Sequence, residues 1–133
     1  MSQENVELAY RTYNAFNRRD LDAFLACMDP AVEFTPRLDP MEGGRHYHGH
    51  AGMRDWWQNL IAVFPDFSTA VLGVRDRGDF IVVALRIRAH GQESGAPFDE
   101  VLWHAAKVRD GKVTWVRAFG SEAKALEAAG LRE

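Results

Sequence analysis

Apolar residues recur every three or four positions through the first half of the chain, the spacing of amphipathic helices. Residues 4–19 are predicted to form the first helix, with a buried stripe of Val6, Ala9, Tyr10, Tyr13 and Phe16. A short second helix follows, capped by Asp20 and burying Leu21, Phe24, Leu25 and Met28. Asp29 and Pro30 should stop it, because proline cannot continue the hydrogen-bond ladder. The third helix should end at Pro65; its apolar face is Met53, Trp56, Trp57, Leu60, Val63 and Phe64.

Beyond Pro65 the apolar period changes from about 3.6 to 2, which predicts strands. These cover residues 67–74, 80–89, 98–109 and 112–119, and Asp110-Gly111 is typical of a tight hairpin turn. A short strand at 31–35 and a short helix at 121–131 complete the prediction. Three helices followed by a four-strand antiparallel meander indicate an α+β fold. The helices should cover one face of a curved sheet and leave a concave ligand cavity between the two layers.

Composition narrows the classes of function. The chain has 133 residues, 47% hydrophobic and 26% charged, the balance of one globular domain. A net charge of −3, with basic residues interleaved with acidic ones, argues against a nucleic-acid-binding surface. The sequence has no secretory signal pattern and no apolar run near the roughly 18 residues of a membrane span, so we expect a cytoplasmic protein. The single cysteine, Cys27, is expected to be a small buried hydrophobe.

Four segments together resemble the SnoaL-like, ketosteroid-isomerase-like proteins of the nuclear transport factor 2-like superfamily. They are FNRRDLDAFLACMDPAVEF, YHGHAGMRDWW, HAAKVRDGKV and ALEAAGL, and the resemblance covers nearly the whole chain. It implies a cone-shaped fold of three N-terminal helices packed on a curved antiparallel sheet, with a short C-terminal helix. It also implies a homodimer packed through its sheets. It leaves the activity open, because this superfamily hosts isomerases, cyclases, dehydratases, epoxide hydrolases and binding-only members.

In ketosteroid isomerases, a helix tyrosine and a strand aspartic acid form an oxyanion hole, and a second aspartate moves the proton. Transferred to this chain, the resemblance puts Thr12 at the tyrosine, with Tyr13 one step away, and His104 at the oxyanion-hole acid. The general base falls on Phe34, so steroid isomerase activity is not expected. Dehydratases of this fold use a cavity histidine, which His104 could supply.

His104 is the candidate catalytic residue. Lys107 and Arg109 should face solvent, so strand alternation turns His104 to the inner face. An unperturbed histidine pKa near ~6.5 suits proton transfer at neutral pH. A histidine that is only a satisfied core group is the alternative.

The candidate ligand-binding residues are Tyr13, Trp56, Trp57, Glu100 and Arg117. Tyr13 needs a partner for its hydroxyl, which a cavity ligand could be. Of Trp56 and Trp57, one should line the pocket and the other support it. Glu100 shares the parity of His104 but lies about 13 Å along the strand, at the rim or in solvent. Alternation from Lys112 turns the Arg117 side chain inward, whereas the resemblance implies that it faces outward.

Three histidines stand at alternate positions, His46, His48 and His50. Same-face residues on a strand are roughly 6.5 Å apart, so the three cannot easily converge on one metal ion. A bent loop could bring two together, with Asp39 or Glu42 as a third ligand. The resemblance implies instead a short extended arm, a turn at Gly49 and the start of a helix. We expect a structural or entrance-lining role, no metal and no cofactor.

Two hypotheses remain. In the first, the protein is an acid–base cyclase, isomerase or dehydratase acting on a bulky apolar ketone or enol, with His104 moving or donating the proton. In the second, it is a non-catalytic domain that binds an apolar small molecule. The missing carboxylate at Phe34 favours the second, and the inward His104 favours the first.

Overall fold

The helices and strands come from a computed structural model that describes residues 2–36, 46–90, 95 and 97–130. Over these residues the helices are α1 (Ser2–Asn17), α2 (Leu21–Ala26), α3 (Gly49–Val63) and α4 (Glu122–Ala128). The strands are β1 (Met28–Thr35), β2 (Tyr47–His48), β3 (Ser68–Asp76), β4 (Phe80–His90), β5 (Pro97–Arg109) and β6 (Lys112–Phe119). None of these helices is long and apolar enough to cross a membrane.

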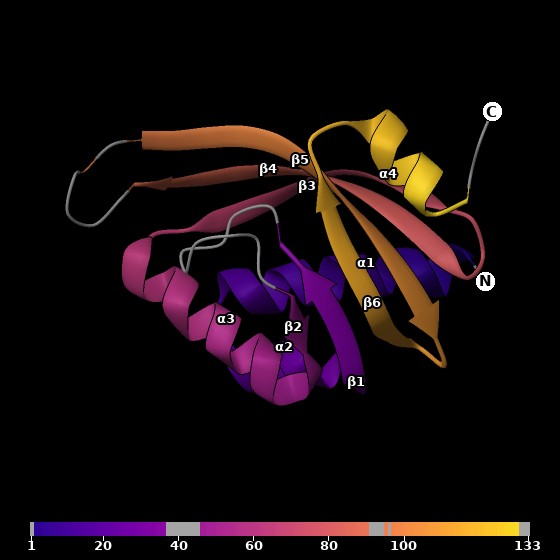
Figure 1. The fold of residues 1–133 in the computed structure, drawn as a ribbon, viewed down its shortest axis with the longest axis horizontal. Coiled ribbons are helices and arrows are strands. Elements are labelled where there is room, and N and C mark those ends of the chain that lie inside the picture. The colour runs from indigo at the N-terminus through magenta and orange to yellow at the C-terminus, as the bar shows by residue number, and fades with distance from the viewer. Residues whose placement is uncertain (1, 37–45, 91–94, 96, 131–133) are drawn as a thin grey trace.

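The six strands form one curved sheet in the order β2-β1-β6-β5-β4-β3. Strands β3 to β6 pair antiparallel, so the predicted α+β fold and its meander are confirmed. The sequence predicted the first strand, at residues 31–35, but not its position in the sheet. It pairs with β6 in parallel and with β2 antiparallel, which extends the sheet beyond the meander. Figure 1 shows β1 and β6 bending away from the long strands and around the helices.

The junction between α2 and β1 differs from the prediction. Helix α2 ends at Ala26 instead of reaching Pro30, and Met28 already belongs to β1, opposite Val113 of β6. The reason is a tertiary hydrogen bond, because the Val113 N–H donates to the Cys27 carbonyl at 2.9 Å. The expected caps are confirmed: the Asp20 carboxylate accepts from the Ala23 N–H, and Ser121 caps α4 in the same manner.

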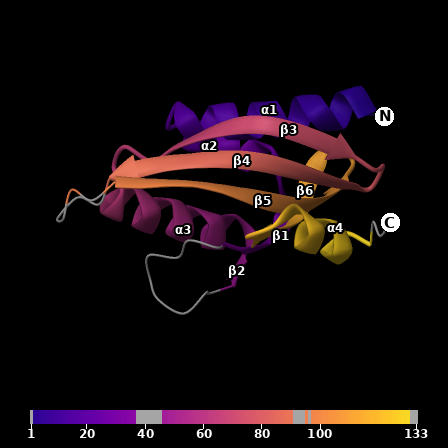
Figure 2. The ribbon, with the colours of Figure 1, turned by 90° about the horizontal axis from the view of Figure 1, so that it is seen from above.

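Helices α1, α2 and α3 cover the concave face of the sheet, and α4 lies on the opposite face (Figure 1). Seen from above, α1 runs beside the edge strand β3 (Figure 2). The Asn17 side chain joins them, because its amide donates to the Thr69 carbonyl at 2.8 Å and accepts from the Thr69 N–H at 2.9 Å. This amide therefore occupies the hydrogen-bonding edge where a further strand would pair. Tyr10, predicted on the buried stripe of α1, is instead 43% exposed.

Candidate functional site

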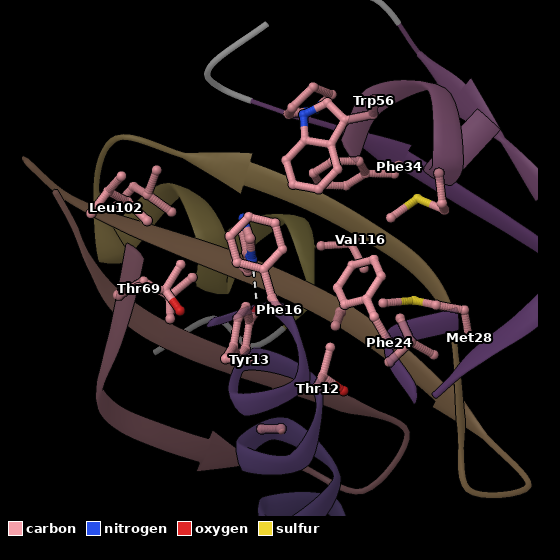
Figure 3. Close-up of a pocket in the computed structure, with 18 of the residues that line it drawn as sticks. Thr12, Tyr13, Phe16, Phe24, Met28, Phe34, Trp56, Thr69, Leu102 and Val116 are labelled. Carbon is pink, nitrogen blue, oxygen red and sulfur yellow. Dashed lines mark hydrogen bonds between the residues drawn. The ribbon is translucent and has the colours of Figure 1, made fainter. Parts of the chain in front are cut away.

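A pocket opens between the concave face of the sheet and the three N-terminal helices (Figure 3). Its empty volume is about 780 Å³, a figure that includes the open space at its mouth. Its lining comes from α1, α2, α3 and every strand except β2. The lining residues are Ala9, Thr12, Tyr13, Phe16, Phe24, Met28, Phe34, Pro36, Met53, Trp56, Phe67, Thr69, Ile81, Leu85, Ile87, Leu102, His104, Ala106, Val113 and Val116.

The wall of this pocket is apolar and, among the described residues, carries no carboxylate, lysine or arginine. Two of its polar groups are already engaged. The Thr12 hydroxyl donates to the Leu8 carbonyl within α1 at 2.7 Å, and the Thr69 hydroxyl donates to the Asn17 side chain at 3.1 Å. Tyr13 and His104 are therefore the groups best placed to meet a polar atom of a ligand.

Tyr13 and His104 form a hydrogen-bonded pair inside the pocket. The Tyr13 hydroxyl lies 2.6 Å from Nδ1 of His104, and Figure 3 draws this bond beside Tyr13. Helix α1 supplies Tyr13 on the turn before Phe16, whose ring anchors the helix against Trp57 and Phe67. Strand β5 supplies His104 by alternation, with its side chain on the same face as those of Leu102 and Ala106.

Both members of the pair are neutral at pH 7, and burial opposes the charged form of each. It lowers the pKa of His104 to about 4, because the imidazolium loses its hydration. It raises the pKa of Tyr13, because the phenolate loses its hydration. The unperturbed histidine pKa that the sequence argument used therefore does not hold here, and His104 is suited to hydrogen bonding rather than to carrying charge.

The proton positions follow from the acidities of the two groups. A phenol is the stronger acid, so we assign the bond as Tyr13 O–H donating to Nδ1, which leaves the imidazole proton on Nε2. Among the residues that the structure describes, Nε2 has no hydrogen-bond partner. It is also not one of the unpartnered polar atoms that are fully buried. It is the open hydrogen-bonding position of the pair within the pocket.

Phe34 occupies the position that the resemblance gives to a general base. Its ring meets His104 edge-on at a centroid distance of 6.0 Å and Trp56 at 4.8 Å. The Trp56 indole N–H is sealed from solvent and lacks a partner among the described residues. Figure 3 shows Trp56 lying over Phe34 at one end of the pocket. The Phe34 ring therefore lies against His104 and is itself packed against Trp56.

The comparison with protein-family models identifies the family of this chain. The model of the SnoaL-like domain matches residues 9–116. The chain belongs to the SnoaL-like domain family. No curated protein matches the chain.

Solved structures share the fold of this SnoaL-like domain at low sequence identity. TerC, co-crystallised with polyporic acid, is 24% identical over 96% of this chain and 98% of its own, with a TM-score of 0.78. IdmH, a putative polyketide cyclase from Streptomyces antibioticus, is 21% identical over 94% and 97%, with a TM-score of 0.74. A ketosteroid-isomerase-like protein from Catenulispora acidiphila, in complex with trimethylamine, is 14% identical over 95% and 94%, with a TM-score of 0.77.

The two adjacent tryptophans of this SnoaL-like domain have different surroundings. Trp56 lines the pocket, whereas Trp57 lies behind it. The Trp57 ring packs against Phe16 and Phe24, each at a centroid distance of 4.9 Å. Trp57 therefore supports the wall and does not line the cavity.

Glu100 and Arg117 lie outside the pocket. Glu100 is exposed near the start of β5, opposite Ile87. Arg117 is exposed, and its guanidinium lies over the Phe119 ring. A β-bulge explains the parity of β6: Lys107 pairs with Trp115 and Val108 with Val113, so Thr114 is an extra residue. Val113 and Val116 consequently both line the pocket, and simple alternation from Lys112 fails beyond the bulge.

The three alternate histidines have separate surroundings. His46 contacts Thr35 at 3.0 Å and Glu33 at 3.2 Å, whereas Nε2 of His50 contacts the Met28 carbonyl at 3.0 Å. His48 is exposed, ends β2 and is the N-cap residue of α3. Among the described residues, no three His, Cys, Asp or Glu side chains gather as metal ligands; Asp39 and Glu42 lie outside those residues. Gly49 makes the turn with a φ of +72°, and a Cβ there would lie 3.2 Å from the Pro30 carbonyl.

Sequence reasoning named both members of the central pair but did not join them. The resemblance placed the oxyanion-hole tyrosine at Thr12, one residue before Tyr13. A one-residue shift along α1 would have paired Tyr13 with His104. The signal for that shift is that Tyr13, and not Thr12, belongs to the predicted buried stripe of the first helix.

Proposed function

We propose that this SnoaL-like domain binds a neutral, largely apolar ketone or enol and polarises its oxygen with the Nε2–H of His104. The observation that carries the proposal is the 2.6 Å bond between Tyr13 and His104 in an otherwise apolar pocket. Tyr13 fixes the orientation of the imidazole, and when its hydroxyl donates to Nδ1 the imidazole proton lies on Nε2. The reaction class that this supports is enolisation of the bound ketone, as the first step of an isomerisation, cyclisation or dehydration.

The chemistry follows from where charge develops. When a C–H next to the carbonyl loses its proton to a water molecule, negative charge builds on the carbonyl oxygen. A fixed donor in a water-poor pocket stabilises that oxygen more in the transition state than in the ground state. A neutral imidazole is a suitable donor, since it spends no desolvation energy on a charge of its own.

Binding without turnover is the second candidate. It is favoured by Phe34, which leaves no carboxylate near His104 among the described lining residues. Water is then the remaining proton acceptor for a bound ketone. A ketone whose C–H bonds are weakly acidic would bind without reacting at a useful rate, and only a more acidic one would react.

The solved structures with bound molecules support small-molecule binding in this fold. TerC was crystallised with polyporic acid and the Catenulispora protein with trimethylamine. At 24% identity or less these likenesses carry the fold, and the ligand class proposed for this chain rests on its own pocket.

Two readouts test the proposal on a panel of steroid ketones, tetralones and polycyclic hydroxyketones. Thermal shift reports binding, because a ligand that prefers the folded state raises the melting temperature with its concentration. Incorporation of deuterium from D₂O next to the carbonyl, followed by NMR, reports enolisation. The variant is His104→Gln, and the matched control is His90→Gln, which changes an exposed histidine outside the pocket.

We expect one class of ketone to stabilise the wild type and the His90 control, with a smaller shift for His104→Gln. Deuterium incorporation that His104→Gln lowers by tenfold or more supports the enzyme, since removing a single donor to a developing oxyanion has effects of about 10²–10³. Binding without incorporation supports the second candidate. A panel that shifts neither protein rejects both.

We also propose a homodimer formed through the outer face of the sheet. Helix α4 packs on β4, β5 and β6 of that face. Leu72 of the β3 bulge is 56% exposed and Val101 of β5 is 41% exposed. Light scattering after gel filtration tests it: Val101→Arg should convert a dimer to a monomer, and a wild-type monomer rejects the proposal.

A further inference from the structure

The lining residues that the structure describes offer no counter-charge to an anion. His104 contacts Tyr13 of α1 and Phe34 of β1, and Phe34 in turn packs against Trp56 of α3. On the neighbouring strands the register partners of His104 are Val83 and Ala118. Of these residues, Tyr13 is the one with a titratable side chain, and burial holds it in the neutral form.

An anion that entered such a pocket would lose its hydration without gaining a partner of opposite charge. The cost of that transfer is several kcal/mol in real proteins, so the neutral form of an ionisable ligand is strongly preferred. A molecule that is an anion in water can avoid the cost by binding together with a proton.

The Tyr13–His104 pair can receive that proton without a change in position. A tyrosine hydroxyl both donates and accepts, and a neutral imidazole can carry its proton on either nitrogen. With Tyr13 donating to Nδ1, Nε2–H donates to a ketone oxygen. With Nδ1–H donating to the Tyr13 oxygen, the Nε2 lone pair accepts the O–H of an enol. The same 2.6 Å contact serves both arrangements.

Resting on the proposed function, we propose that the pocket binds acidic enols, such as enolised 1,3-dicarbonyl compounds and hydroxyquinones, in their protonated form. A ligand that is an enolate in water then takes up one proton from solvent as it binds. In the balance, the enolate, one proton and the free protein give a complex in which the bound ligand is neutral. The proton lies between the enol oxygen and Nε2 of His104, and no bond of the carbon skeleton changes.

Two probes that differ in their acidic proton test whether a proton is taken up on binding. The first is 2-hydroxy-1,4-naphthoquinone, an acidic enol that is ionised at pH 7.5. The second is 2-methoxy-1,4-naphthoquinone, which has the same ring system and no acidic proton. Isothermal titration calorimetry in phosphate and in Tris counts the protons exchanged, because the two buffers differ in their heat of ionisation.

We expect about one proton taken up per hydroxyquinone bound and none per methoxyquinone. Affinity for the hydroxyquinone should fall about tenfold per pH unit from pH 6 to 8, as one linked proton requires, and affinity for the methoxyquinone should not change. His104→Gln should weaken hydroxyquinone binding about tenfold, the effect of one buried hydrogen bond, whereas His90→Gln should leave it unchanged.

The outcomes separate this inference from the proposed function. Binding of both probes with no proton uptake means that the enolate enters as an anion, which overturns the inference and leaves the proposed function standing. Binding of the methoxyquinone alone overturns it in the same way. If neither these probes nor the neutral ketones bind, the proposed function falls, and the inference falls with it.

Discussion

The hydroxyl of Tyr13 and Nδ1 of His104 lie 2.6 Å apart although 91 positions separate the two residues in the chain. This bond joins the first helix to the central part of the sheet. It also sets the polarity of the pocket, because both partners are half-buried among apolar side chains and remain neutral at pH 7. Its strength and its protonation can be measured separately.

Removing the Tyr13 hydroxyl should destabilise the fold. In Tyr13→Phe, Nδ1 of His104 loses its hydrogen-bond partner, which costs about 1–3 kcal/mol for a buried polar group. Urea unfolding measures the loss, with Tyr10→Phe as the control on the exposed side of α1. Equal stability of the two variants would mean that the bond between Tyr13 and His104 contributes nothing to the fold.

His104 should make the protein less stable in mild acid. Its pKa is about 4 in the folded protein and about 6.5 in the unfolded chain, so the unfolded chain binds a proton first as the pH falls. The stabilisation is fully present above pH ~6.5 and is lost between pH ~6.5 and about 4, to an extent on the order of 3 kcal/mol.

The check on this pH dependence is urea unfolding of the wild type and His104→Gln at several values between pH 7.5 and 4.5. The carboxylates, including Asp66 and Asp99 with their lowered pKa values, are the same in both proteins. The difference between the two curves therefore reports His104. Parallel curves would show that His104 titrates normally in the folded state.

A carboxylate at position 34 should supply the base that the described lining of the pocket lacks. In Phe34→Asp, the new side chain replaces a ring that faces His104, so a bound ketone would have a donor on its oxygen and a base nearby. We expect deuterium incorporation next to the carbonyl to rise about 10²-fold or more, the usual contribution of a positioned base.

The matched variant is Phe34→Asn, which loses the same packing without gaining a base. Both variants should lose about 3–5 kcal/mol of stability, because Phe34 is only 3% exposed. Equal incorporation by the Asp and Asn variants would contradict the assignment of position 34 as the missing base.

The Asn17 amide should contribute to holding α1 against the sheet. Asn17→Ala removes its hydrogen bonds to the backbone and hydroxyl of Thr69, with an expected loss of about 1–2 kcal/mol. Asn14→Ala on the same helix is the control, since its side chain is exposed and the contact with Thr69 is made by Asn17. Hydrogen exchange of the Thr69 amide should accelerate in the Asn17 variant alone, and protection that survives would place the restraint elsewhere.

Local patterns in the sequence determined the elements. The helical period over α1 and α3, the alternation through β3 to β6, and the capping residues Asp20 and Ser121 each depend on neighbours a few positions away. Alternation was also sufficient to turn His104 inward. The resemblance to SnoaL-like proteins added the layer arrangement, which the sheet order confirms.

The tertiary structure decided what depends on contacts between distant segments. The parallel pairing of β1 with β6 shortened α2, and the bulge at Thr114 broke the alternation that had turned Arg117 inward. The bond between Tyr13 and His104 required α1 and β5 to meet at one register. The lowered pKa of His104 required the pocket to close around it. Burial and hydrogen-bond partners are properties of the packed chain, so the sequence could nominate His104 but only the fold could set its protonation.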